Sequence, residues 1–194
     1  MNFAKVNMIC WGAFFLVWLI GAIYNSYKGP QVTKRTTNSW RLWLIGLVIV
    51  WILKRIVPYH IWFSLRWNMP ILQIIGVIVL VAGTLFTLWA RVALGTMWSS
   101  SITLKSDHVL RTYGPYRITR HPIYTGMLTM LIGSTLTTGV IFVPVFIVAV
   151  LILFIKIRNE EKLMIETFGQ QYLDFRQRVP QLIPGLRWNL VSPK

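Results

Sequence analysis

The sequence is poor in cysteine and in charged side chains. Its single cysteine, Cys10, excludes an intrachain disulfide and a cysteine cluster, and we expect it to serve in packing. Charged residues make up only 13% of the chain, well below the roughly 25% of soluble domains. Apolar residues make up 55%. This composition is typical of a protein whose solvent is a lipid bilayer.

The sequence also lacks a G-x-G-x-x-G segment and any alternation of strands and helices that would accompany it. A cofactor domain of the Rossmann type is therefore excluded. We expect no bound metal.

The apolar residues are collected into five blocks, each close to the roughly 20 residues that a helix needs to cross the bilayer. We predict spans at 8–24, 40–57, 71–90, 123–138 and 140–157. The last two come from one long apolar stretch, which breaks at a predicted turn around residues 137–139. The predicted fold class is all-α: a single domain, a polytopic membrane protein of about five transmembrane helices.

The first and the fourth predicted spans have further features. The first span is long and aromatic and is not followed by a small-residue cleavage site, so we expect it to remain in the mature protein rather than to act as a cleaved signal. The fourth contains small residues such as Gly126 and Gly133, which either allow close helix packing in lipid or are ordinary span composition.

The distribution of positive charge predicts the orientation. Of the 20 lysines and arginines, 16 lie in the segments 28–41 and 91–122 or after residue 155, all on one side of the predicted bilayer. The positive-inside rule then places the N-terminus outside and the C-terminus in the cytoplasm. We interpret Lys28, Lys34 and Arg35 as topology signals and contacts to anionic lipid headgroups. Nucleic acid is not an expected partner, despite the net charge of +15.

The polar segment 108–124, between the third and fourth spans, is dense in hydrogen-bonding side chains. Pro122 disfavours helical geometry at His121 and suits the first position of the helix that follows. His121 is therefore expected beside the free N–H groups of a helix start, a place that attracts anions. The alternative is a purely interfacial role, with the neighbouring tyrosines as an aromatic belt.

The segment 156–184 continues the fifth span without a helix breaker and has apolar residues at helical spacing, which predicts a cytoplasmic C-terminal amphipathic helix. Gly169 predicts a bend in it. We expect this helix to fold back over the segment 108–124. The adjacent Glu160 and Glu161 either pair locally with neighbouring cations or accept hydrogen bonds from a ligand.

These two segments together resemble the isoprenylcysteine carboxyl methyltransferases, with the motif residues in the same order and spacing. The resemblance covers the C-terminal half and rests on Tyr116, Arg120-His121-Pro122, Tyr124, Gly126, Glu160-Glu161, Phe168-Gly169, Tyr172, Val179-Pro180 and Ile183-Pro184. Related membrane methyltransferases that act on phospholipid amines or thiols share much of this pattern.

The resemblance implies that S-adenosylmethionine is the cofactor. Its contacts carry over to His108, Val109, Leu110, Arg111, Tyr116, His121, Pro122, Ile123, Tyr124 and Glu160. Where the family has a substrate-contacting arginine, this chain has Lys156, with Arg158 nearby. The expected catalytic group is Arg120, His121 and Tyr124: Arg120 or Lys156 to orient the acceptor, a tyrosine ring to face the sulfonium, and His121 as the base if the acceptor must lose a proton.

The expected function is methylation of the carboxylate of a prenylated cysteine or of a similar lipidic acceptor that enters from the bilayer. A carboxylate is already ionised at neutral pH and needs no base. Methylation of a phospholipid amine or a thiol is the alternative. A channel or transporter would place ionisable residues in mid-span, and the predicted spans contain essentially none. Membrane sterol reductases carry a similar motif, but five spans are too few for their architecture.

Overall fold

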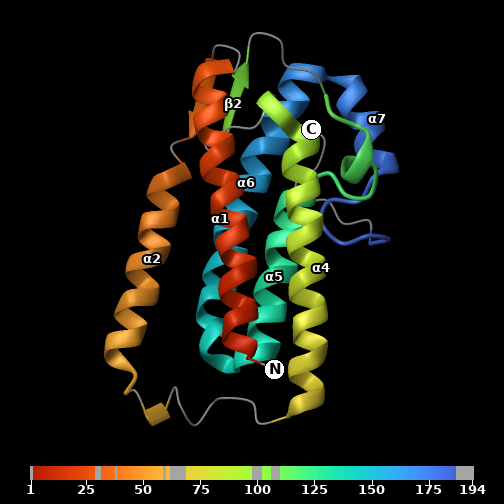
Figure 1. Ribbon diagram of the computed structural model, residues 1–194. Coiled ribbons are helices and arrows are strands. Elements are labelled where there is room, and N and C mark those ends of the chain that lie inside the picture. Colours follow the sequence, from red (N-terminus) through yellow and green to blue (C-terminus); the bar gives the residue numbers. More distant parts are fainter. Residues whose placement is uncertain are drawn as a thin grey trace.

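The computed structural model describes residues 2–28, 32–37, 39–58, 60–61, 69–97, 102–105 and 110–186. The described α-helices are α1 (Phe3–Lys28), α2 (Ser39–Ile56), α4 (Pro70–Leu94), α5 (Pro122–Thr138), α6 (Val143–Phe168) and α7 (Gln170–Arg178). Short 3-10 helices lie at Gly95–Met97, Gly114–Arg117 and Val140–Phe142. Figure 1 shows the long helices side by side, with the N-terminus at the lower end and β2 and α7 at the upper end.

Each predicted span lies on one of the five long helices. By length and composition alone, two of the described helices are long and apolar enough to cross a membrane: α1 and α4 with its extension, Pro70–Met97. The crossings by α2, α5 and α6 stay a prediction. Large apolar side chains cover the outer faces of the bundle, including Ile9, Leu16, Leu19, Ile20, Leu47, Ile71, Ile74 and Ile78, all more than half or close to half exposed. Such a continuous exposed apolar surface is suited to lipid.

Helices α4 and α5 approach so closely that only glycine fits at their contact. A β-carbon at Gly133 would clash with the backbone nitrogen of Leu80, and one at Gly83 would lie 2.8 Å from the backbone nitrogen of Met130. In the same helix contact, a β-carbon at Gly126 on α5 would clash with the hydroxyl of Thr87 on α4. The predicted role of the small residues in close packing is therefore confirmed for this helix pair.

Helix α1 is joined to α5 by polar contacts within the bundle. The amide nitrogen Nδ2 of Asn7 donates to Oγ1 of Thr137 at 2.6 Å, and Nε1 of Trp11 donates to Oγ of Ser134 at 3.0 Å. Cys10 lies in the packed cluster between these helices, as expected of a packing residue, together with Phe14, Leu80 and Met130. Hydrogen bonds between helices in lipid fix their rotation and register.

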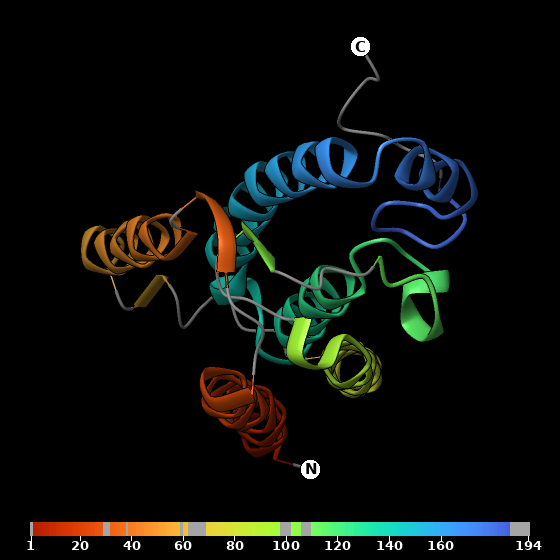
Figure 2. The same ribbon diagram turned by 90° about the horizontal axis from the view of Figure 1, so that it is seen from above.

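Helix α2 packs mainly on α6. Gly46 faces the side chains of Val148 and Ile152, which would lie 2.8 Å from an added β-carbon. Seen from above, α1 and α2 lie on different sides of the bundle, with α6 next to α2 (Figure 2). Side chains of α1, α2, α5 and α6 line a cavity in this part of the bundle.

The sequence did not predict the pair of antiparallel strands at the upper end, β1 (Val32–Thr37) and β2 (Ile102–Lys105). Their register pairs Val32 with Lys105 and Thr37 with Ile102, with irregularities between. The two strands come from loops that are far apart in the chain. A pairing of this kind depends on the helix bundle bringing the two loops together, which local pattern does not reveal.

The predicted C-terminal helix is present, and the predicted bend at Gly169 is confirmed. Gly169 has a φ of +51°, a conformation that favours glycine, and it separates α6 from α7. The apolar stripe of this region forms a second packed cluster of Tyr172, Phe175 and Val179, with Leu110, Met164, Ile165 and Phe168 against it. Leu110 belongs to the segment before α5, so α7 packs over that segment as expected.

We expect Gly133→Ala to destabilise the protein, because the added methyl group would overlap backbone atoms of α4 that cannot move independently. Overpacking of this kind costs about 1–3 kcal/mol. Thermal unfolding in detergent measures the effect as a lowered melting temperature.

The matched control is Gly12→Ala, on α1, where an added β-carbon has no neighbour within 4 Å. That change should leave stability unchanged or raised, since alanine favours a helix over glycine. Equal melting temperatures for the two variants would contradict the close-packing interpretation.

Candidate functional site

The start of α5 is anchored by the C-terminal segment. Pro122 begins the helix and His121 precedes it with a non-helical ψ of 61°. The backbone N–H of Arg120 donates to the carbonyl of Pro180 at 2.9 Å, and that of His121 donates to the carbonyl of Gln181 at 3.2 Å. The segment after α7 therefore lies along residues 120–121 and fixes where their side chains point.

A buried ion pair joins the start of α5 to α6 and α7. Nε and Nη2 of Arg120 both lie 2.8 Å from Oε1 of Glu161, and the two side chains are 1% and 0% exposed. Nη1 of Arg120 also donates to the carbonyls of Arg176 at 3.0 Å and Val179 at 2.6 Å. One guanidinium thus holds three segments together. Charge-assisted hydrogen bonds of this kind are stronger than hydrogen bonds between neutral groups.

The carboxyl of Glu161 is held in its ionised form. Burial by itself would raise the pKa of Glu161, but the hydrogen bond and charge of His121 and the charge of Arg120 outweigh it and lower the pKa to about 2. Glu161 is therefore an anion at neutral pH.

The imidazole of His121 lies between two carboxylates. Its Nε2 is 3.4 Å from Oε1 of Glu161, and its Nδ1 is 3.5 Å from Oε2 of Glu160. The ring stacks on that of Tyr124, with centroids 5.7 Å apart and planes 10° apart. Burial alone would lower the pKa of His121, but the hydrogen bonds and charges of both glutamates raise it above its ordinary value.

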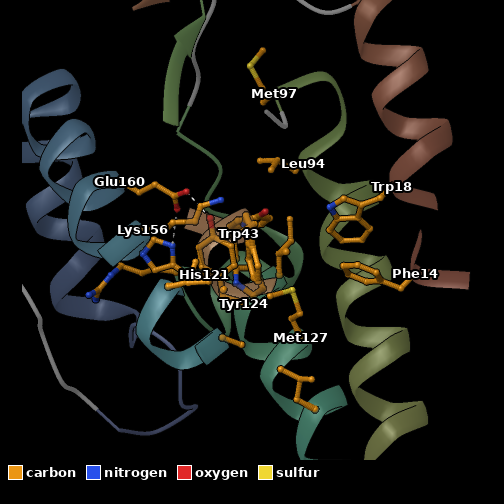
Figure 3. A pocket seen from close by; sticks show the side chains of 18 of the residues that line it. Phe14, Trp18, Trp43, Leu94, Met97, His121, Tyr124, Met127, Lys156 and Glu160 are labelled. Atoms are coloured by element: carbon orange, nitrogen blue, oxygen red, sulfur yellow. Dashed lines mark hydrogen bonds and ion pairs between the residues drawn. The ribbon is translucent and has the colours of Figure 1, made fainter. Parts of the chain in front are cut away.

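Glu160 is the more accessible carboxylate, with its side chain 25% exposed. The hydroxyl of Tyr124 donates to its Oε1 at 2.5 Å, and Nζ of Lys156 lies 5.5 Å from the centroid of the Tyr124 ring. Burial would raise the pKa of Glu160, but the His121 hydrogen bond and the charge of Lys156 lower it overall. Figure 3 shows His121, Tyr124, Lys156 and Glu160 gathered at one place in the cavity wall.

These polar groups form one end of a cavity of about 890 Å³. Most of the rest of its wall is apolar, and α1, α2, α5 and α6 contribute much of it. This apolar compartment is lined by Trp11, Phe14, Phe15, Trp18, Trp43, Leu44, Leu47, Val50, Met127, Leu131, Val148, Ala149 and Ile152. In Figure 3, Phe14 and Trp18 face the cavity from the side opposite Lys156 and Glu160. The cavity can therefore hold a ligand with a polar head and a long apolar part.

The structure brings most of the predicted site residues to this one cavity. Its wall contains Leu110, Arg111, Tyr116, Arg120, His121, Pro122, Ile123, Tyr124, Lys156 and Glu160. Arg158 is exposed and is not part of the wall. His108 and Val109 lie outside the described residues.

Sequence reasoning missed the walls that the first two spans contribute. A signal was present in α1, where Trp11, Phe14 and Trp18 recur at steps of 3 and 4, so that they share a helix face. It also missed the partners of Glu161. The sequence leaves open a local pairing with Lys156, Arg158 or Lys162. In the described residues, the ion pairs of Glu161 are instead with Arg120 and His121, from the segment before α5.

Apolar outer faces around a cavity with a polar end indicate a membrane protein with a candidate ligand site. The family model of the isoprenylcysteine carboxyl methyltransferase family matches residues 75–166. Over this range, slightly less than half of the chain, the sequence is similar to that family.

Three similar proteins illustrate the relationship. The protein-S-isoprenylcysteine O-methyltransferase of Tribolium castaneum is 30% identical over 80% of this chain and 52% of its own length. The methanethiol S-methyltransferase of Pseudomonas deceptionensis is 34% identical over 43% of this chain and 31% of its own. The solved structure of a eukaryotic intramembrane Ras methyltransferase is 27% identical with a TM-score of 0.57, over 78% of this chain and 55% of that one. The chain thus spans about half the length of the first relatives it matches.

We expect Arg120→Met and Glu161→Gln each to destabilise the protein by about 3–5 kcal/mol, since each change leaves a buried charge without its main partner. The double variant should lose no more than the worse single variant. The measurement is a double-mutant cycle on unfolding in detergent.

Arg178→Met is the control, because Arg178 is an exposed arginine on the same part of the chain. It should change stability by less than about 0.5 kcal/mol. Strictly additive losses for Arg120→Met and Glu161→Gln would show that the pair is not coupled.

Proposed function

We propose that the protein is an S-adenosylmethionine-dependent methyltransferase that methylates the carboxylate of a prenylated cysteine or of a similar lipidic acceptor. The observation that carries this is that one cavity contains both the polar cluster of His121, Lys156 and Glu160 and an apolar compartment into which the cluster opens. A ligand with one charged end and a lipid tail matches such a cavity.

The residues at the polar end fit the cofactor. The carboxylate of Glu160 faces the cavity and can accept hydrogen bonds from amino or hydroxyl groups. The helix start at Pro122 presents free backbone N–H groups, which suit a carboxylate. The rings of Tyr116 and Tyr124 line the same space and suit a cation. When bound, S-adenosylmethionine supplies a methyl group on a sulfonium, whose carbon–sulfur electron pair stays on sulfur when an acceptor atom takes the methyl.

Lys156 is the candidate for holding the acceptor's carboxylate. Its side chain is buried at 7% exposure, comes from one helical turn before Glu160 and lies in the cavity wall. The guanidinium of Arg120 is engaged by Glu161 and by two carbonyls, which favours a positioning role for Arg120 and leaves Lys156 to meet the substrate. Positioning and charge stabilisation would then carry the catalysis.

The predicted orientation belongs to this proposal. The polar end of the cavity is built from the start of α5 and the C-terminal part of α6, and α6 leads to α7 at the upper end of Figure 1. The predicted excess of lysine and arginine is on this same side, which the positive-inside rule assigns to the cytoplasm. The active end would thus face the cytoplasm, and the lipid tail would enter from the bilayer.

A second candidate is methylation of a thiol or of a phospholipid amine. It is supported by the similarity to the methanethiol S-methyltransferase. Incubation of the purified protein with tritiated S-adenosylmethionine and a panel of prenylcysteines, fatty acids, phosphatidylethanolamine and thiols separates the two. Label in a base-labile ester favours the carboxylate, and base-stable label on nitrogen or sulfur favours the second candidate.

We expect Glu160→Gln to weaken binding of S-adenosylmethionine by about 10- to 100-fold, because a hydrogen bond to a charged group contributes roughly 1.5–3 kcal/mol. Isothermal titration calorimetry in detergent measures the affinity. The matched control is Glu166→Gln, an exposed glutamate on the same helix, which should leave the affinity unchanged.

Tyr116→Ala and His121→Ala should weaken cofactor binding as well. Wild-type affinity in all three site variants would refute the cofactor site.

We expect Lys156→Gln to raise the KM for a carboxylate acceptor about 10-fold or more, because a buried cation that faces an anion is replaced by a neutral group. Initial rates at saturating cofactor give the KM. Arg158→Gln, two residues along the same helix but exposed, tests the alternative substrate contact; a larger effect there than at Lys156 would reverse the assignment.

A further inference from the structure

Both ring nitrogens of His121 face carboxylate oxygens that lie on α6. Nδ1 is 3.5 Å from Oε2 of Glu160, and Nε2 is 3.4 Å from Oε1 of Glu161. An ionised carboxylate has no hydrogen to donate, so each nitrogen can interact favourably with it only by carrying a proton. A ring with protons on both nitrogens is an imidazolium cation.

The contacts around both carboxyls lower the pKa of Glu160 and of Glu161, which favours the ionised form of each. Oε1 of Glu161 accepts from Nε of Arg120 at 2.8 Å, which requires the anion side of an ion pair. Oε1 of Glu160 accepts the hydroxyl of Tyr124 at 2.5 Å, while its other oxygen faces His121. The titratable and charged groups around the imidazole are Glu160 and Glu161 on α6, Tyr124 and Lys156 beside Glu160, Arg120 beside Glu161, and Tyr172 on α7.

We infer that His121 is a fixed imidazolium, that Glu161 is the positioning residue that holds it so, and that the site therefore takes an acceptor that arrives already ionised. The inference rests on the proposed function for its last step only. A carboxylate forms its bond to the methyl carbon with a lone pair that it already has, so no proton enters or leaves. An ammonium or a thiol must first lose a proton, and a ring with protons on both nitrogens cannot accept it.

The sign of the pH dependence follows from the same contacts. The two glutamates raise the pKa of His121 above its ordinary value near 6.5, so the ring loses its second proton at a higher pH than a free histidine does. Replacing Glu161 by glutamine removes one of the two negative charges. The titration of His121 should then move to lower pH.

The experiment is an NMR titration of protein labelled with ¹⁵N-histidine, in detergent micelles and without cofactor or acceptor. The chain has three histidines, and His121→Gln identifies the signals of His121. In the wild type we expect both ring nitrogens of His121 to stay protonated at pH 7.5. In Glu161→Gln the midpoint should fall by about one pH unit or more, as expected for the loss of a close ion pair. Glu166→Gln should leave the midpoint unchanged.

A wild-type His121 that is neutral at pH 7.5 would overturn the inference, and so would a midpoint that Glu161→Gln leaves in place. If Glu161→Gln does not fold, the wild-type titration decides alone. Because the sample contains no cofactor, failure here is separate from failure of the proposed function, which the calorimetric titration with S-adenosylmethionine reports.

Discussion

The buried pair of Arg120 and Glu161 links the helices of the bundle to the segments that form the site. Arg120 precedes α5, Glu161 lies on α6, and the guanidinium also holds the carbonyls that end α7. Two buried charges are costly to desolvate, and the cost is offset only when every donor has a partner. A site built on such a pair forms only when three distant parts of the chain have reached their final places.

The same pair determines what the neighbouring side chains do. Glu161 uses one oxygen for both Arg120 and His121, so the position of the imidazole depends on the ion pair behind it. His121 in turn lies against the ring of Tyr124, which donates to Glu160. Contacts therefore lead without a gap from the buried pair to the cavity wall. They end at the more accessible carboxylate, Glu160.

Part of this candidate site could be predicted from the sequence, because some of its features are set by neighbouring residues and the others are implied by the family resemblance. Pro122 marks a helix start and so places His121, and the run of apolar residues after Glu160 predicts a helix that returns over it. The partners of Glu161 could not be found this way, since Arg120 is 41 residues away and its nearest charged neighbours in the chain compete as candidates. The strand pair β1–β2 was missed for the same reason, as was the wall contributed by Trp43 on α2. Each of these contacts is set by how the bundle packs.

The packing of the bundle also explains why polar and apolar parts of one cavity can be built by different helices. Gly83 and Gly133 bring α4 and α5 into backbone contact, while α1 and α2 contribute aromatic side chains to the cavity wall. A tightly packed helix pair can thus hold the His121 cluster in fixed geometry while the wall from α1 and α2 accommodates an apolar group. Under the proposed function, changes in Trp18 or Trp43 alter which lipid tail fits, and changes at Glu161 alter which acceptor atom can react, so that the two kinds of specificity reside on different helices.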